Sequence, residues 1–191
     1  MSRNGMRALA VAAALGLGVL AWSSSAAIAA DTQQQASLGF KGLGAHIGLV
    51  DPENASSTVA LGVHIDGGEF VRNVHFSPLV EYWSVGSSIA GYNLDRSDFS
   101  VGTDVTVDFP VQGSRVVPYA GGGLGLHFLG IDSNVPNVNT DTRSKLGLNI
   151  QGGIRNDVMP NMSLFGEVRY NFVDTQNQLK ILGGFTYHFI Y

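Results

Sequence analysis

The sequence predicts an all-β fold, an eight-stranded antiparallel up-and-down transmembrane β-barrel after an N-terminal signal peptide. Three observations support this prediction. A basic and then apolar segment opens the chain, later stretches alternate apolar with small or polar residues, and only 14% of the residues are charged. A soluble domain carries about 25% charged residues, whereas a strand between lipid and a polar lumen needs large apolar groups on one face only.

The N-terminus has the three regions of a secretory signal peptide. Arg3 and Arg7 make a basic start, residues 8–22 form an apolar run, and Ala27-Ile28-Ala29 is an A-x-A cleavage site. The alternative is a membrane-anchoring helix, but the run is shorter than the ~20 residues that a span needs, and small residues follow it directly. The pattern therefore favours a cleaved peptide.

We expect residues 1–29 to be removed, with cleavage near Ala29 or Ala30, and residues 30–191 to form one barrel domain. The number of Lys and Arg residues then falls from 11 to 9 (11 − 2). With 15 acidic residues, the mature chain has a net charge of −6 (9 − 15). An acidic chain without a basic run is a poor candidate for nucleic acid binding. The chain has no cysteine, which excludes a disulfide scaffold and a lipidated N-terminal Cys.

Segments with a period of two follow the signal peptide, and turn-rich stretches separate them. In the clearest segment, Val59, Leu61 and Val63 alternate with Ala60 and Gly62. The eight segments are Phe40–Val50, Thr58–Asp66, Val71–Trp83, Phe99–Phe109, Pro118–Phe128, Lys145–Ile154, Met162–Phe172 and Gln178–Tyr191. The even count and the lengths near ten residues suit a tilted transmembrane barrel.

The connections alternate in length. Tight turns are predicted at residues 67–69, 110–114 and 156–161, longer loops at 51–57, 85–98 and 129–144, and a short last link at 173–178. Short periplasmic turns and longer outer loops are typical of membrane barrels. A soluble lipocalin-type barrel is the alternative, but the second face of the strands is mainly Gly, Ser and Thr, which suits a narrow interior.

Aromatic residues gather at the strand ends of the apolar face. We expect them to form two interfacial girdles, where amphipathic rings meet lipid headgroups. The predicted outer girdle consists of Tyr82, Phe99, Phe128, Tyr170 and Phe172, and the predicted inner girdle of Phe109, Phe189 and Tyr191.

The C-terminal segment ends in Tyr187-x-Phe189-x-Tyr191. This ending resembles the C-terminal strand signal of Gram-negative outer-membrane barrels, and across its eight segments the chain is similar to the small OmpA- and OmpX-like barrels. The resemblance implies export to the cell outer membrane and insertion by the barrel assembly machinery. It also implies contact with outer-membrane lipids and lipopolysaccharide, and we expect a monomer that binds no cofactor.

Six charged residues fall on the predicted lumen face: Glu81, Asp104, Lys145, Glu167, Arg169 and Lys180. One interpretation is an ion or proton path, and the other is a structural plug of salt bridges. Charges in so narrow an interior must pair, because an unpaired buried charge is costly. We favour the plug, since eight strands leave no open channel.

The histidines and one serine motif are the remaining candidates for chemistry. The 5 histidines come from separate segments without ligand spacing, so polar packing is favoured over metal binding. His75-Phe76-Ser77 with Glu81 resembles the His-x-Ser of lipid A deacylases, but Pro78 follows the serine and the motif points inward. We therefore expect no catalytic residues and no metal site.

These features predict a non-enzymatic outer-membrane barrel with a structural or surface-interaction role in the cell envelope. Two alternatives stay open at this point. One is a narrow, OmpW-like conduit for ions or small apolar molecules, and the other is a lipid A-modifying enzyme. The resemblance alone does not choose among them.

The C-terminal signal can be tested directly. Replacing Phe189 and Tyr191 by Ser should leave export intact but lower the outer-membrane level, because the assembly signal and an interfacial anchor are both lost. Membrane fractionation and heat-modifiable gel mobility would measure this, and unchanged outer-membrane levels would contradict it.

Overall fold

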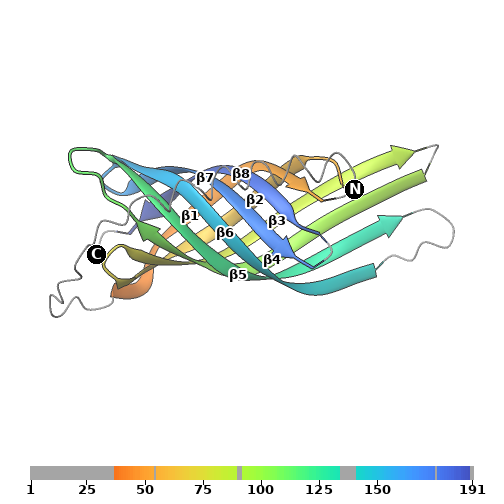
Figure 1. The fold of residues 1–191 in the computed structure, drawn as a ribbon, viewed down its shortest axis with the longest axis horizontal. Coiled ribbons are helices and arrows are strands. Elements are labelled where there is room, and N and C mark those ends of the chain that lie inside the picture. The colour runs from red at the N-terminus through yellow and green to blue at the C-terminus, as the bar shows by residue number, and fades with distance from the viewer. Residues whose placement is uncertain (1–36, 54, 90–91, 134–140, 175, 190–191) are drawn as a thin grey trace, which may run out of the picture. The chain divides into compact units, whose positions relative to one another are not determined.

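The computed structural model describes residues 37–53, 55–89, 92–133, 141–174 and 176–189. Each strand pairs antiparallel with the next, and β8 pairs with β1, so the sheet closes into a barrel (Figure 1). The strands are β1 (Ser37–Pro52), β2 (Thr58–Val71), β3 (Val74–Ile89), β4 (Tyr92–Asp108), β5 (Val116–Ser133), β6 (Asp141–Met159), β7 (Met162–Val173) and β8 (Gln178–His188). The predicted eight-stranded antiparallel barrel is confirmed, while the predicted signal peptide lies outside the described residues.

The two ends of the barrel differ in their connections. At the terminal end, where β1 begins and β8 ends, residues 72–73, 109–115 and 160–161 connect the strands. At the opposite hairpin end, β3 and β4 pair as far as Ile89 opposite Tyr92, and β5 and β6 as far as Ile131 opposite Asp141. Figure 1 shows these two hairpins extending beyond the other strands.

The prediction of a long loop at residues 85–98 is wrong. β3 continues to Ile89 and β4 begins at Tyr92, so most of these residues lie in the strand ladder. The sequence there is rich in Ser and Gly and lacks the apolar alternation used to recognise the strands. Backbone ladder hydrogen bonds do not need apolar side chains, so the ladder extends past the membrane-facing part of the strands.

The predicted turn at residues 67–69 is also wrong. These residues lie inside β2, where the register with β3 shifts between His64 and Glu69. Gly68 adopts a φ of 83°, and its N–H donates to Asp66 Oδ1 at 3.0 Å. The glycine pair therefore makes a bulge, and the chain reverses further on, at Arg72–Asn73, where Asn73 has a φ of 64°.

The apolar face of the strands points outward. Leu61 and Leu146 are 56% and 69% exposed. Ala60, which precedes Leu61 and faces the lumen, is 0% exposed, and the lumen-facing Trp83 is 1% exposed. This arrangement is the reverse of a soluble lipocalin-type barrel, whose apolar face would line the interior. The described residues contain no helix that is long and apolar enough to cross a membrane.

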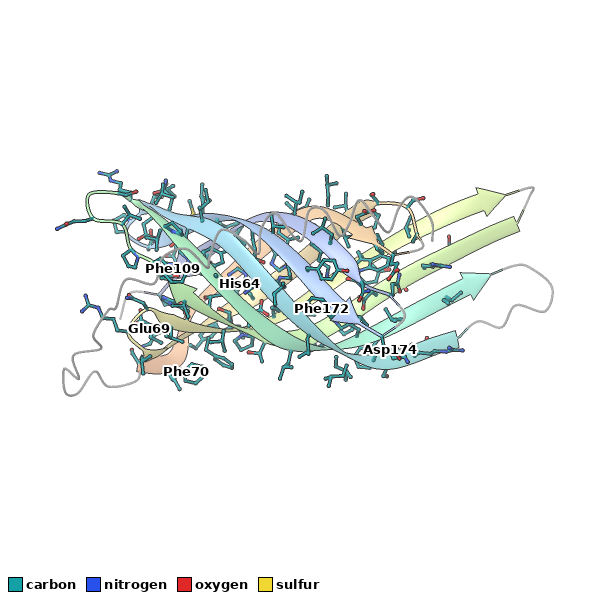
Figure 2. The ribbon with its side chains drawn as sticks, viewed as in Figure 1. His64, Glu69, Phe70, Phe109, Phe172 and Asp174 are labelled. Carbon is teal, nitrogen blue, oxygen red and sulfur yellow. The ribbon has the colours of Figure 1, made fainter. Side chains whose placement is uncertain are left out.

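Aromatic rings meet in contacts near both ends of the apolar face. Phe99 and Phe128 lie 6.0 Å apart between ring centroids toward the hairpin end, where Tyr170 and Phe172 also meet, at 4.8 Å. At the terminal end, Phe189 contacts Tyr187 at 5.8 Å and Phe40 at 5.1 Å. Figure 2 shows Phe70 and Phe109 at one end and Phe172 toward the other, and Tyr191 lies outside the described residues.

The outward face can be tested by charge insertion. Val105→Arg should reduce the free energy of folding into lipid vesicles by about 2–4 kcal/mol, because a charge near the bilayer midplane is costly. The matched control is Val111→Arg, since Val111 is 53% exposed in a connection at the terminal end. Urea titrations of both variants would measure the difference, and equal tolerance of both would contradict a lipid-facing Val105.

Candidate functional site

The centre of the lumen holds an ion pair between strands that are distant in sequence. Lys180 on β8 donates to Glu81 on β3, and His46 Nε2 on β1 donates to the second oxygen of Glu81 at 3.1 Å. Glu81 is 2% exposed and Lys180 is 1% exposed. The pair is therefore buried, and it joins strands across the interior as well as near the β1–β8 closure.

A second cluster surrounds Arg169 on β7. Its Nη2 lies 2.8 Å from Asp104 Oδ2 and 2.8 Å from Glu167 Oε1, and its Nε donates to the same Glu167 oxygen at 2.9 Å. The Tyr119 hydroxyl donates to the other Glu167 oxygen at 2.8 Å, and Asn149 Nδ2 donates to Asp104 Oδ1 at 2.8 Å. The guanidinium is thus held between carboxylates from two strands.

A layer toward the hairpin end combines an indole with polar groups. Trp83 Nε1 donates to Gln178 Oε1 at 3.3 Å, and Gln178 Nε2 donates to Asp98 Oδ2 at 2.7 Å. His127 Nδ1 donates to the same Asp98 oxygen at 2.8 Å. A buried apolar cluster completes the layer, made of Val50, Ala60 and Trp83 with Val85 packed against it. The layer fills the lumen between the central charges and the hairpins.

A relay of four side chains lies at the terminal end. His188 Nδ1 donates to Asp66 Oδ2 at 3.0 Å, and Ser163 Oγ lies 2.8 Å from His188 Nε2. Ser163 also donates to Asp157 Oδ1 at 2.7 Å. The four residues come from β2, β6, β7 and β8, so the relay ties together strands on both sides of the β1–β8 seam.

The order Ser163–His188–Asp66 has the hydrogen-bonding pattern of a serine hydrolase triad. Ser163 is only 1% exposed, so a substrate has no access to its hydroxyl oxygen. Asp157 also competes with His188 for the single hydroxyl hydrogen. The relay is therefore better suited to holding strands together than to nucleophilic attack. The residues are 97 and 25 positions from one another along the chain (163 − 66 and 188 − 163), which is why sequence patterns did not reveal them.

Two small cavities lie in the described part of the lumen. One, of about 90 Å³, lies toward the terminal end, and the other, of about 20 Å³, lies toward the hairpin end. Leu79, Asp104 and Arg169 line both cavities, so the Arg169–Asp104 ion pair stands between them. Binding sites for small molecules are usually about 300–1,000 Å³, and these cavities are well below that size.

The structure brings five of the six predicted lumen charges into the interior: Glu81, Asp104, Glu167, Arg169 and Lys180. The sixth, Lys145, lies apart from them and pairs with Asp174 at the hairpin end, where its side chain is 28% exposed. Of the predicted C-terminal signal, Tyr187 is exposed on the apolar face and Phe189 packs on it, while Tyr191 lies outside the described residues.

The serine motif and the histidines have other partners. His75 lies 3.1 Å from Asp108 and 3.5 Å from Glu69, while Glu81 is bound by Lys180 and His46, so His75, Ser77 and Glu81 are not linked. His64 is hydrogen-bonded to Thr186 at 2.9 Å, and its ring stacks on that of His46. Among the described residues no group of three or more His, Cys, Asp or Glu side chains has the geometry of a metal site.

Comparison with known proteins identifies the family. The profile of the outer-membrane protein β-barrel domain matches residues 10–189. The chain belongs to this family. Sequence comparison with curated proteins gives no match. The chain's membership of this family and its closed barrel together agree with an outer-membrane location.

Solved structures of small outer-membrane barrels share the fold. Neisserial surface protein A is 21% identical over 79% of this chain and 98% of its own, with a TM-score of 0.63. The N-terminal β-barrel domain of Pseudomonas aeruginosa OprF is 14% identical over 79% and 99%, with a TM-score of 0.52. Yersinia pestis Ail, solved with the heparin analogue sucrose octasulfate, is 16% identical over 78% and 99%, with a TM-score of 0.51.

The central ion pair can be tested by a double-mutant cycle. Glu81→Gln and Lys180→Met should each lower the free energy of unfolding by about 3–5 kcal/mol, because each leaves a buried charge unpaired. The double variant should lose less free energy of unfolding than the two single variants lose together. Lys145→Met is the matched control, since its partner Asp174 is 71% exposed and exposed pairs contribute about 0–1 kcal/mol. Additive losses in urea unfolding from vesicles would contradict the pairing.

Proposed function

We propose that this outer-membrane barrel is non-enzymatic and has a structural or surface-interaction role in the cell envelope. The observation that carries the proposal is the obstruction of its lumen. Ion pairs around Glu81 and Arg169 and the layer around Trp83 leave cavities of about 90 Å³ and 20 Å³ with an ion pair between them. With the interior obstructed, the outer surface and the two ends of the barrel are the parts that can contact other molecules.

The same proposal includes an orientation. The protein is exported through its signal peptide and inserted by the barrel assembly machinery, with the terminal end toward the periplasm. Short turns at that end and the extended β3–β4 and β5–β6 hairpins at the other support this direction, because membrane barrels place short turns in the periplasm and longer connections outside. The exposed Tyr187 beside Phe189 supports recognition of β8 during assembly.

The two alternative functions have less support. A conduit needs a continuous path, and the Arg169–Asp104 ion pair separates the two cavities. A lipid A-modifying enzyme needs a nucleophile that substrate can reach, and the hydroxyl of Ser163, which contacts His188, is buried. Neither alternative is favoured by a specific arrangement of the described side chains.

Planar-bilayer recordings would test the obstructed lumen. We expect no single-channel steps from the mature protein, because Trp83 and Arg169 block the interior at two levels. The variant Trp83→Ala with Arg169→Ser removes both side chains and should conduct. Tyr170→Ala, which changes an aromatic on the outward face, is the matched control and should remain closed.

Two results would contradict the proposed function. Single-channel current steps from the unmodified protein that are as large as those from the double variant would show an open lumen. Altered acylation of lipid A or phospholipid, seen by mass spectrometry when the protein is expressed and absent with Ser163→Ala, would show an enzyme.

A further inference from the structure

Four cations on the lumen side of the strands, Lys145, Arg155, Arg169 and Lys180, each lie within ion-pair distance of at least one Asp or Glu side chain. The pairs are Lys145–Asp174, Arg155–Asp108, Arg169–Asp104, Arg169–Glu167 and Lys180–Glu81. These cations are therefore neutralised within the protein.

Three cations at the terminal end differ from these. Arg72 and Arg115 lie exposed in the β2–β3 and β4–β5 connections, and Lys41 is half-buried on β1. Within the part of the chain that the structure describes, none of the three makes an ion pair or a side-chain hydrogen bond. We call Lys41, Arg72 and Arg115 the cationic rim.

The carboxylates at the terminal end are engaged elsewhere. They bind lumen-side partners in the contacts Asp66–His188, Glu69–His75, Asp108–Arg155 and Asp157–Ser163. None of these contacts reaches the cationic rim. Its positive charge therefore remains available to a partner outside the protein.

The cationic rim lies directly beside membrane-facing apolar residues. Lys41 follows Phe40, which is 52% exposed, and Arg72 lies two residues after Phe70, which is 39% exposed. Arg115 precedes Val116, which is 37% exposed and starts β5. A strand advances about 3.3 Å per residue, so one or two residues place a charge at the depth of lipid phosphates rather than in free solution.

The hairpin end has the opposite character. Asp51, Glu53, Asp95 and Asp174 are exposed there. The cations of that end, Arg96, Arg143 and Lys145, occupy the register positions of the lumen face. Figure 2 shows Asp174 near the hairpin end and Phe70 and Phe109 at the terminal end. Although Arg143 is exposed at the hairpin end and Asp157 at the terminal end, the exposed charges of the described residues are mainly negative at the hairpin end and mainly positive at the terminal end.

We infer that the cationic rim binds the phosphate groups of anionic glycerophospholipids in the periplasmic leaflet. This inference rests on the orientation proposed above. Guanidinium groups bind phosphate in a bidentate manner, and a lysine adds a point charge. Aromatic neighbours at the interface favour a lipid surface over a soluble anion. Each basic residue near an anionic membrane surface strengthens association by roughly five-fold.

Folding of the mature chain into vesicles of two compositions would test the inference. One set is phosphatidylcholine alone, and the other contains a fifth phosphatidylglycerol, both at low salt. The measured quantity is the ratio of the folding equilibrium constants in the two lipids. We expect Lys41→Gln, Arg72→Gln and Arg115→Gln together to lower this ratio on the order of 100-fold, and 0.5 M salt to remove the difference between variant and parent.

Single substitutions supply the matched control. Arg72→Gln and Lys145→Gln remove the same charge from opposite ends of the barrel, so only Arg72→Gln should change the ratio. Lys145→Gln should weaken folding equally in both lipids, because its partner is Asp174. An equal change in the ratio for both variants would show that the ratio depends on net charge and not on the position of the charge, and this would overturn the inference.

The remaining outcomes separate the inference from the proposed function. Failure of the parent protein to fold into either vesicle would contradict the membrane location itself. Normal folding with a ratio that the triple variant leaves unchanged would overturn only the lipid-binding rim. Binding of the parent protein to purified peptidoglycan that the triple variant loses, with the ratio unchanged, would assign the rim to a different anion and also overturn the inference.

Discussion

The pairing of buried charges across the lumen is the constraint on which the other features depend. Glu81 and Lys180 lie 99 residues apart in the sequence and meet only when β8 has returned beside β1. Removing either partner would leave a charge in a narrow interior that cannot hydrate it well. The open sheet lacks this pair, so the charges favour the closed barrel over partly closed forms.

The lumen glycines make this arrangement sterically possible. A Cβ atom on Gly44 would collide with the ring of His64, and one on Gly62 would collide with the ring of His46. On the other side of the barrel, a Cβ on Gly147 would lie 2.7 Å from the ring of His127. The glycines therefore leave the volume that the imidazole rings occupy. The rings of His46 and His127 bond to carboxylates, and that of His64 bonds to Thr186.

This interior explains why function is better sought on the surface. Tyr119 binds Glu167, and Asn149 and Arg169 bind Asp104 near the centre of the lumen, and the cavities there are small. The two ends of the barrel differ in connection length and in outward charge. In the proposed orientation, the barrel presents hairpins to one compartment and a basic, aromatic rim to the leaflet on the other side.

The sequence by itself determined the strand pattern and the identity of the lumen face. Alternation such as that of Val59 to Val63 follows from the two-residue period of a strand, so it can be recognised without knowing any partner. The same period placed Glu81, Asp104, Glu167, Arg169 and Lys180 inside. It could not place the β3–β4 hairpin, because Ser- and Gly-rich strands beyond the lipid lack that alternation.

Only the tertiary structure decided which of these residues meet. Whether Arg169 contacts Asp104, or Lys145 contacts Asp174, depends on register and stagger between strands, and a period of two carries no information about either. The Asp66–His188–Ser163 relay and the cationic rim arise in the same way, since closure brings distant segments to one end of the barrel. Local alternation sets which face a side chain takes, and barrel closure sets its neighbours.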